Sequence, residues 1–237
     1  MRAGNNGITE DTVKNIAFGA GTIHKGLKYD YVLLKTEPTD FKTAYQKYYT
    51  RTGEEAPYNY TALESAPQTF ELNKYYSKGW NFEESCVGAT KGGSSVKITP
   101  TFYSVQPDGS TVAIKNFKRK TGETATMEVN LLELTEEIIK ASVVGKNGVS
   151  EASDYSLIQS KDAIEEGDYW ENIAFVGETL EGKNIIVILP NALCTSGLSL
   201  EGKNGEESVG KFTFECHGDV SDSLTTLPYE IYYPATV

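Results

Sequence analysis

One stretch of the chain, residues 88–109, limits the possible folds more than any other, and it reads GATKGGSSVKITPTFYSVQPDG. Glycines stand near its start, and a Pro-Asp-Gly turn closes it. Between them apolar and polar side chains alternate, with Val96, Ile98 and Phe102 in one set and Ser95, Lys97 and Thr99 in the other. Since successive side chains of a strand point to opposite faces, this period of two predicts a strand at 94–104. Such a strand needs a core on one side and water on the other.

Further strands are predicted along the chain, and together they make the fold mainly β. The chain contains 15 Tyr, nine Phe and 22 Gly, which suits half-buried pleated surfaces joined by turns. The first strand is expected at 13–25, with a bend where Gly19 and Gly21 lack a side chain. Later strands are expected at 111–120 and, after a short Thr-Gly-Glu turn, up to residue 134, then at 183–200, at 209–219 and in the tail from 227. The polar stretch 146–166 reads as a loop.

Residues 135–144 carry the signals of one short helix. Thr135 stands where an N-cap belongs, two glutamates follow in the first turn, and Gly145 is expected to end the helix. An apolar stripe is formed by Ile138, Ile139 and Val143. The predicted fold class is therefore mainly β, a β-sandwich or barrel with one packed α-helix and a long insertion, in a single domain covering residues 1–237.

The insertion spans residues 28–85 and is rich in tyrosine. A short helix is expected where Phe41, Tyr45 and Tyr48 share a face. The later part contains two prolines and no regular period, which predicts a long ordered loop or a segment with little structure of its own. Tyrosines at this density suit either stacking on sugars or a protein interface, and we favour the interface. The candidate contact residues are Tyr45, Tyr48, Tyr58, Tyr60, Tyr75 and Tyr76.

Charge and cysteine usage exclude some classes of function. The chain has 22 Lys plus Arg against 33 Asp plus Glu, a formal net charge of -11, so its surface should repel nucleic acid. The basic cluster KNFKRK at 115–120 favours a strand edge protected by charge over a phosphate-binding patch. Cys86, Cys194 and Cys216 are odd in number and lack a CxxC spacing, which predicts a reducing compartment and no disulfide framework. The absence of a long apolar run predicts a soluble protein that the usual export route does not take.

Residues that carry catalytic or metal chemistry are scarce. The histidines are His24 and His217, and the adjacent Cys216 and His217 would point to opposite faces of a strand, which disfavours a metal site. No GxSxG elbow or comparable signature nominates a nucleophile. Neighbouring carboxylates such as Glu136 and Glu137 read as a helix start or as solvated turns. We therefore expect no enzyme activity, no cofactor and no bound metal.

Several segments follow one another in a characteristic order: NIAFGAGTIHK, GATKGGSSVKITPTFYSVQPDG, LLELTEEIIKAS, KNIIVILPNAL and GKFTFECHGD, before a short YEIYYPA end. In this order the chain resembles the major tail tube proteins of long-tailed bacteriophages and prophages. The most specific pieces are the GATKGG strand start with its Asp-Gly turn, the LLELT strand-to-helix junction and the FTFECHGD strand. The resemblance covers the chain from residue 13 to the end, apart from 28–85, which is long for this family.

The resemblance implies a structural virion protein that self-assembles into stacked hexameric rings. Such rings form the tail tube, a hollow conduit for DNA ejection whose wall is a continuous barrel of long strands. In this arrangement Ser95, Lys97 and Thr99 would face the lumen, and the strands 121–134, 183–200 and 209–219 would help to line it. An acidic or neutral lumen is expected, because a conduit must not bind the DNA that slides through it.

The same resemblance sets the expected partners and location. The partners would be further copies of the chain and other tail proteins, DNA would pass without specific binding, and no membrane would be involved. The protein would be made in the cytoplasm of the bacterial host and end in the virion tail. Residues 28–85 and the N-terminal arm would contact the neighbouring ring. The alternative is a monomeric β-sandwich binding module, carbohydrate-binding or adhesin-like, which would share the composition and the glycine-punctuated strands.

Overall fold

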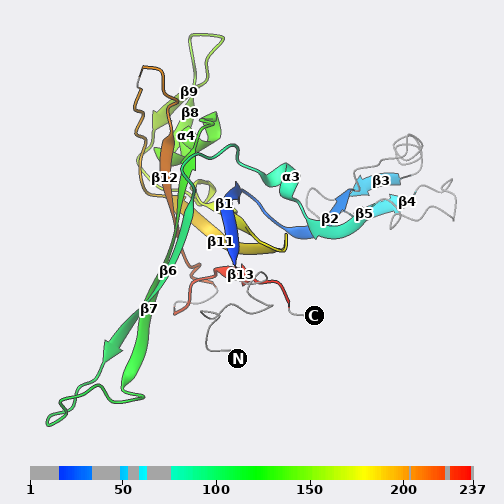
Figure 1. Ribbon diagram of the computed structural model, residues 1–237. Helices are drawn as coiled ribbons and strands as arrows, with labels where there is room; N and C mark the ends of the chain where they lie inside the picture. Colours follow the sequence, from blue (N-terminus) through cyan, green and yellow to red (C-terminus); the bar gives the residue numbers. More distant parts are fainter. Residues whose placement is uncertain are drawn as a thin grey trace. The chain divides into compact units, whose positions relative to one another are not determined.

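A computed structural model describes residues 16–33, 49–52, 59–62, 76–202, 204–221 and 225–235 of the chain (Figure 1). The chain divides into two compact units, one made of Met1–Gly26 with Cys86–Val237 and the other of Leu27–Ser85. The second unit has nearly the same bounds as the insertion predicted at 28–85, and the single-domain arrangement stays a prediction. Each unit is described by itself.

The first unit is built on a seven-stranded antiparallel sheet with the order β1-β10-β11-β12-β7-β6, and β13 also pairs with β11. Its strands are β1 (Ala17–His24), β6 (Ser95–Ser104), β7 (Lys118–Leu131), β10 (Trp170–Thr179), β11 (Asn184–Cys194), β12 (Gly210–Cys216) and β13 (Glu230–Tyr232). Strands dominate the described residues, so the prediction of a mainly β fold is confirmed.

The hairpin of β10 and β11 forms the middle of this sheet. Its turn is closed by the Thr179 N–H, which donates to the Lys183 carbonyl at 2.8 Å, and by Gly182, whose φ of 79° needs a residue without Cβ. The two strands pair without a register shift from Glu178 opposite Asn184 to Trp170 opposite Ala192.

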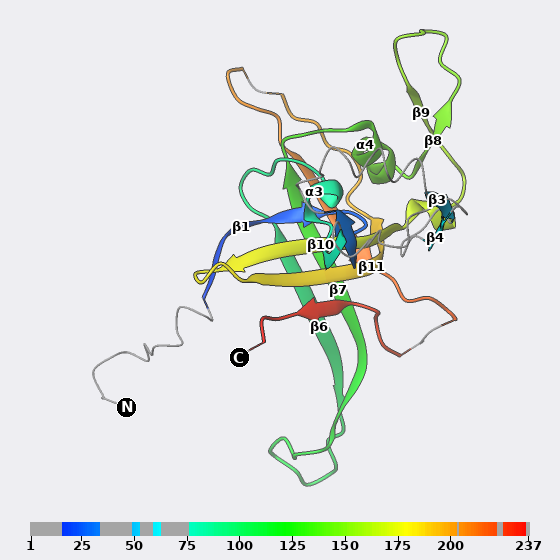
Figure 2. The same cartoon turned by 90° about the vertical axis from the view of Figure 1, so that its right-hand side faces the viewer.

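Two strands share the far edge of β11, and this makes the sheet curl. β13 pairs with Ile186–Ile188, whereas β12 pairs with Ala192–Cys194, so β12 leaves β11 after a short contact. β12 then continues the sheet through β7 to β6. Figure 2 shows β6 and β7 running across the direction of β10 and β11.

The core lies between the inner faces of these strands and the helix. Alternate residues of β7 and β12 are buried, which confirms the period of two that the sequence shows there. They are Ala125, Met127, Val129 and Leu131 on β7, and Phe212, Phe214 and Cys216 on β12. Trp170 of β10 packs against Phe214 with ring centroids 4.8 Å apart. Burying one large apolar side chain stabilises a fold by about 1.5–3 kcal/mol.

The glycines of β1 produce the bend that the sequence predicts. The register against β10 shifts between Phe18 and Thr22, and both Gly19 and Gly21 have positive φ. A Cβ on Gly21 would lie 2.4 Å from the ring of Phe175, so the close approach of β10 also requires glycine there.

The predicted helix is α4 (Glu136–Ser142), and Thr135 caps it by accepting a hydrogen bond from the Ile138 N–H at 3.4 Å. The prediction that Gly145 ends the helix is wrong, because Val144 adopts the left-handed conformation with φ 47°. Gly145 instead starts β8, where a Cβ would lie 2.7 Å from Ile158.

The stretch 146–166, predicted as a loop, contains a short hairpin. β8 (Gly145–Gly148) pairs with β9 (Leu157–Ser160), and a 3-10 turn follows at Glu166–Asp168. Strands of four residues carry too few positions for a period to be recognised in the sequence.

Three strand boundaries also differ from the prediction. The Thr-Gly-Glu sequence at 121–123 is no turn, since it lies inside β7 and Gly122 pairs with Thr101 of β6. The real reversal of the chain lies between Ser104 and Lys118, where 111–117 was expected to be strand. The strand expected at 183–200 is β11, which ends at Cys194.

The second unit contains paired strands and not only loop, which corrects the prediction for this segment. β2 (Tyr29–Leu33) pairs with β5 (Tyr76–Trp80), and β3 (Tyr49–Thr52) pairs with β4 (Asn59–Ala62). Asn81 then precedes α3 (Phe82–Ser85), and its Oδ1 accepts a hydrogen bond from the Lys28 N–H at 2.8 Å. The helix expected at Phe41–Tyr48 lies outside the described residues.

Candidate assembly surface

Strand β6 forms one edge of the large sheet, and it is the longest edge that this sheet leaves open. β7 pairs with it from Ser95 to Ser104, and no other strand of the described chain pairs with its second side. Val96 and Ile98 are partly buried and pack against the core, so β6 is anchored in the fold. Its outer N–H and C=O groups, apart from the N–H that Pro100 lacks, are therefore available to the strand of another molecule.

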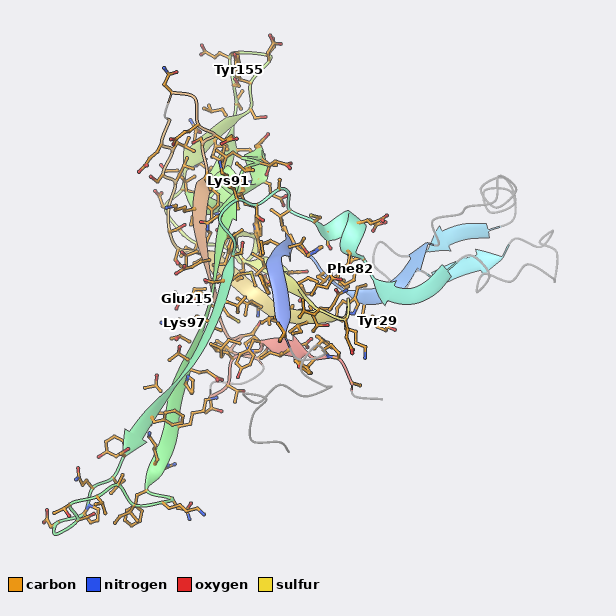
Figure 3. The ribbon with its side chains drawn as sticks, viewed as in Figure 1. Tyr29, Phe82, Lys91, Lys97, Tyr155 and Glu215 are labelled. Atoms are coloured by element: carbon orange, nitrogen blue, oxygen red, sulfur yellow. The ribbon has the colours of Figure 1, made fainter. Side chains whose placement is uncertain are left out.

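The outer face of β6, β7 and β12 is polar along its whole length. In-register partners place Ser95 beside Glu128 and Glu128 beside Thr213, and two residues further on they place Lys97, Thr126 and Glu215 in a row. Figure 3 labels Lys97 and Glu215, which end this second row on β6 and β12. We call this surface the polar face, and its members are Ser95, Lys97, Thr99, Thr124, Thr126, Glu128, Thr213 and Glu215.

The polar face includes all three residues that the sequence predicts for a lumen. Ser95, Lys97 and Thr99 are exposed on it, and their orientation toward a lumen stays a prediction. The other five members were not singled out from the sequence, although the same period of two places them on one face of their strands. What the sequence does not contain is the pairing of β6 with β7 and of β7 with β12.

Strand β11 does not take part in this surface, contrary to the hypothesis that 183–200 helps to line a channel. From Ile185 to Cys194 every residue is buried or half-buried, and the strand has neighbours in the sheet on both edges. Its half-buried residues include Ile185, Val187 and Pro190, so β11 has no row of polar side chains like that of the polar face.

Beyond the polar face, β6 and β7 continue as a two-stranded arm, residues 100–122. β12 pairs with β7 only between Thr126 and Leu131, so the arm has no third strand. The ladder extends past β6 through the Val105 N–H, which donates to the Phe117 carbonyl at 2.9 Å. Every residue from Thr101 to Thr121 is exposed except Ser110. Figures 1 and 2 show the arm running away from the rest of the sheet.

The arm combines large apolar side chains with a basic cluster. The exposed apolar residues are Phe102, Tyr103, Val105, Val112, Ile114 and Phe117. The basic residues of KNFKRK fall in the same place, with Lys118 at the start of β7 and its Nζ 5.0 Å from the centre of the Phe102 ring. Within the described part of the chain, Lys115, Lys118 and Arg119 form no ion pair with a carboxylate.

A buried carboxylate fixes the base of the arm. Glu123 has a side chain only 4% exposed and forms an ion pair with Lys120. It also accepts a hydrogen bond from the Leu227 N–H at 2.9 Å and contacts the Tyr229 hydroxyl at 3.5 Å. The hydrogen bond from Lys120, and next the one from Leu227, hold the pKa of Glu123 below its usual value of 4.5. The arm is thus tied to the C-terminal segment that leads into β13.

The tyrosines predicted as contact residues can be placed only in part. Tyr60 lies in β4 and Tyr76 begins β5, both in the second unit. Tyr45, Tyr48, Tyr58 and Tyr75 lie outside the described residues. The interface prediction for all six stays a prediction.

Cys216 and His217, the adjacent residues considered above as metal ligands, differ in their surroundings. Cys216 is buried, which raises the pKa of its thiol to about 11, while His217 lies in a surface pocket of about 360 Å³ with Glu171 and Asp219. The two neighbours thus occupy opposite sides of the chain, as predicted. In the described part of the chain no group of three or more His, Cys, Asp or Glu side chains is arranged to hold a metal ion. None of the described helices is long and apolar enough to cross a membrane.

Comparison with known proteins yields no relative: no protein family model matches the chain, and no curated protein matches it. The likeness to tail tube proteins therefore depends on the sequence segments that carry it.

Proposed function

We propose that the protein is a structural subunit that assembles through the free edge of β6 into rings, which stack into a tube. The observation that supports this most is the ten-residue edge of β6, whose first part is anchored by Val96 and Ile98 on the core side and is polar on the other. An unpaired edge of this length readily adds a strand from a second molecule, since its backbone groups have no partner. Repeated around a ring, the same contact would join the sheets of neighbouring copies.

The polar face is suited to the inner wall of such a ring. Its members carry one cation, Lys97, against two carboxylates, Glu128 and Glu215, and the exposed Lys211 on the same side of β12 makes the two charges equal in number. A wall without excess positive charge would let DNA pass, because binding to phosphate needs cations that displace its counterions. This agrees with the role that the sequence resemblance implies, a tail tube protein of a long-tailed phage, located in the virion tail with further copies and other tail proteins as partners.

The proposal is tested by negative-stain electron microscopy and light scattering of the purified protein over a range of concentrations. Rings or tubes with a central hole are expected. A protein that stays monomeric at every concentration, and that also fails to add to preformed tubes, would refute self-assembly and favour a monomeric binding module.

One variant pair tests the β6 edge itself. Pro100 lacks an N–H and is tolerated in a strand where its nitrogen faces an open edge, so Ile98, two residues earlier, directs its N–H to the same side. Ile98→Pro should therefore block pairing with another molecule. Ile98→Ala is the control, because it loses a similar amount of packing but keeps the N–H. Equal assembly by both variants would contradict pairing through this edge.

A further inference from the structure

The arm exposes a group of large apolar side chains that the core of the same molecule does not bury. Its six large apolar side chains are 41–69% exposed, and they lie within sixteen consecutive residues, Phe102–Phe117. Single exposed apolar residues are common on proteins, but a contiguous set usually marks an interaction site. These side chains do not contribute to the core, whose members on β7 begin at Ala125.

The charge of the arm is opposite to that of the remaining chain. Residues 100–122 hold four basic side chains and one acidic one, a formal charge of +3, whereas the whole chain carries -11. The remainder therefore carries -14. Since Lys115, Lys118 and Arg119 have no carboxylate partner in the described chain, their charge is available to an acidic surface.

The arm is also ordered in the single chain, by hydrogen bonds of its own. The ladder of β6 and β7 continues to Val105 and Phe117, and the loop beyond is held by two turns, in which Ser110 donates to Pro107 and Phe117 donates to Ile114. At the base, Glu123 ties the arm to Leu227. A binding element that is already ordered loses less conformational entropy on association than a flexible loop.

We propose that the arm of one molecule docks on a second copy of this chain, outside that copy's own arm, with its apolar side chains buried and Lys115, Lys118 and Arg119 matched by carboxylates of the remainder, whose formal charge is -14. The inference rests on the proposed function for the identity of the partner. A second copy of the chain suits the arm as a partner, because outside its own arm it carries a formal charge of -14, opposite in sign to the +3 of the arm. A membrane fits less well, since Gln106, Asp108 and Ser110 make the first turn of the loop polar.

The first experiment reverses the charge of the arm. The triple variant Lys115→Glu, Lys118→Glu, Arg119→Glu is compared with a control that reverses three exposed lysines outside the arm and the polar face, Lys28, Lys146 and Lys183. Both changes alter the net charge equally, so a difference between them comes from position. Sedimentation velocity measures the concentration at which half of the chains are assembled.

For the arm variant this concentration should rise about tenfold, which corresponds to about 1.4 kcal/mol. For the control it should change little. In the wild-type protein it should rise with salt between about 0.1 and 1 M, because the Debye length falls from about 10 to 3 Å. Equal behaviour of the two triple variants would overturn the inference and leave the proposed function standing.

The second experiment identifies what the arm touches. A photo-crosslinking amino acid replaces Val112, which is 69% exposed, in a mixture of light and isotopically heavy chains. Crosslinks between light and heavy chains, from the arm to segments outside it, are expected. Crosslinks only within one chain, or binding of the arm to anionic vesicles without crosslinks between chains, would overturn the proposal. Crosslinks between chains that persist while Ile98→Pro and Ile98→Ala assemble equally would refute edge pairing and keep arm docking.

Discussion

Two substitutions, one in the core and one on the arm, test which aromatic side chains stabilise the fold. Phe212 is 1% exposed in the core, whereas Tyr103 is 60% exposed on the arm. Replacing a buried Phe by Ala removes its burial and leaves a cavity, at a cost of about 3–5 kcal/mol. Replacing an exposed residue changes the free energy of unfolding by about 0.5 kcal/mol or less. Phe212→Ala should therefore destabilise the protein severely, and Tyr103→Ala should not.

The measurement is thermal unfolding followed by near-ultraviolet circular dichroism, at a concentration below that of assembly. For a domain of this size, about 2–4 °C of Tm is lost per kcal/mol, so Phe212→Ala should lower Tm by roughly 6–20 °C. Tyr103→Ala should leave Tm within about 2 °C and should weaken assembly instead. A loss of stability in Tyr103→Ala that approaches the loss in Phe212→Ala would refute the reasoning, because the arm would then be part of the folding unit.

Three further predictions concern single groups. Glu123→Gln should lower the free energy of unfolding by about 1–3 kcal/mol, because a buried carboxylate loses its ion pair. Since the pKa of Glu123 is lowered in the fold, its stabilisation is present above pH 4.5 and is lost as the pH falls below that value, so urea unfolding of the two proteins should converge in acid. Alkylation at pH 8 should modify exposed Cys86 quickly and buried Cys216 slowly, because burial raises the pKa of Cys216 to about 11, and mass spectrometry of the labelled peptides checks this. Thr135→Ala should cost about 0.5–1 kcal/mol through loss of the cap on α4, as measured by thermal unfolding against Thr135→Ser.

The sequence predicts those parts of the fold whose signals are local. The period of two predicts β6 (Ser95–Ser104) to within one residue, and it places Val96 and Ile98 on the core side. It is wrong for Phe102, which is 50% exposed because the register shifts between Thr101 and Phe102. The cap and acidic first turn identify α4. In each case the physical cause lies within a few residues of the element, so neighbouring strands are not needed to recognise it.

The misjudged parts depend on contacts between distant residues. Thr-Gly-Glu at 121–123 has the composition of a turn, but Gly122 is held in β7 by pairing with Thr101. Glycine is common at the end of a helix, but at position 145 it is needed because a Cβ there would clash with Ile158. The polar face likewise requires knowledge of which strands are neighbours, and alternation within one strand cannot supply it.

The edge of β6 and the arm together favour open or ring-shaped assemblies over closed dimers. An edge alone can pair with its own copy across a two-fold axis, and such a dimer buries both edges and grows no further. The arm cannot pair with a second arm in this way, because Lys115, Lys118 and Arg119 would meet like charges. It must contact a different surface of the partner, which makes the contact heterologous and leaves each new copy with a free arm or a free acceptor. Reversal of the three charges removes the attraction between the arm and its acceptor, so the association that remains in the arm variant, through the β6 edge alone, should end at dimers.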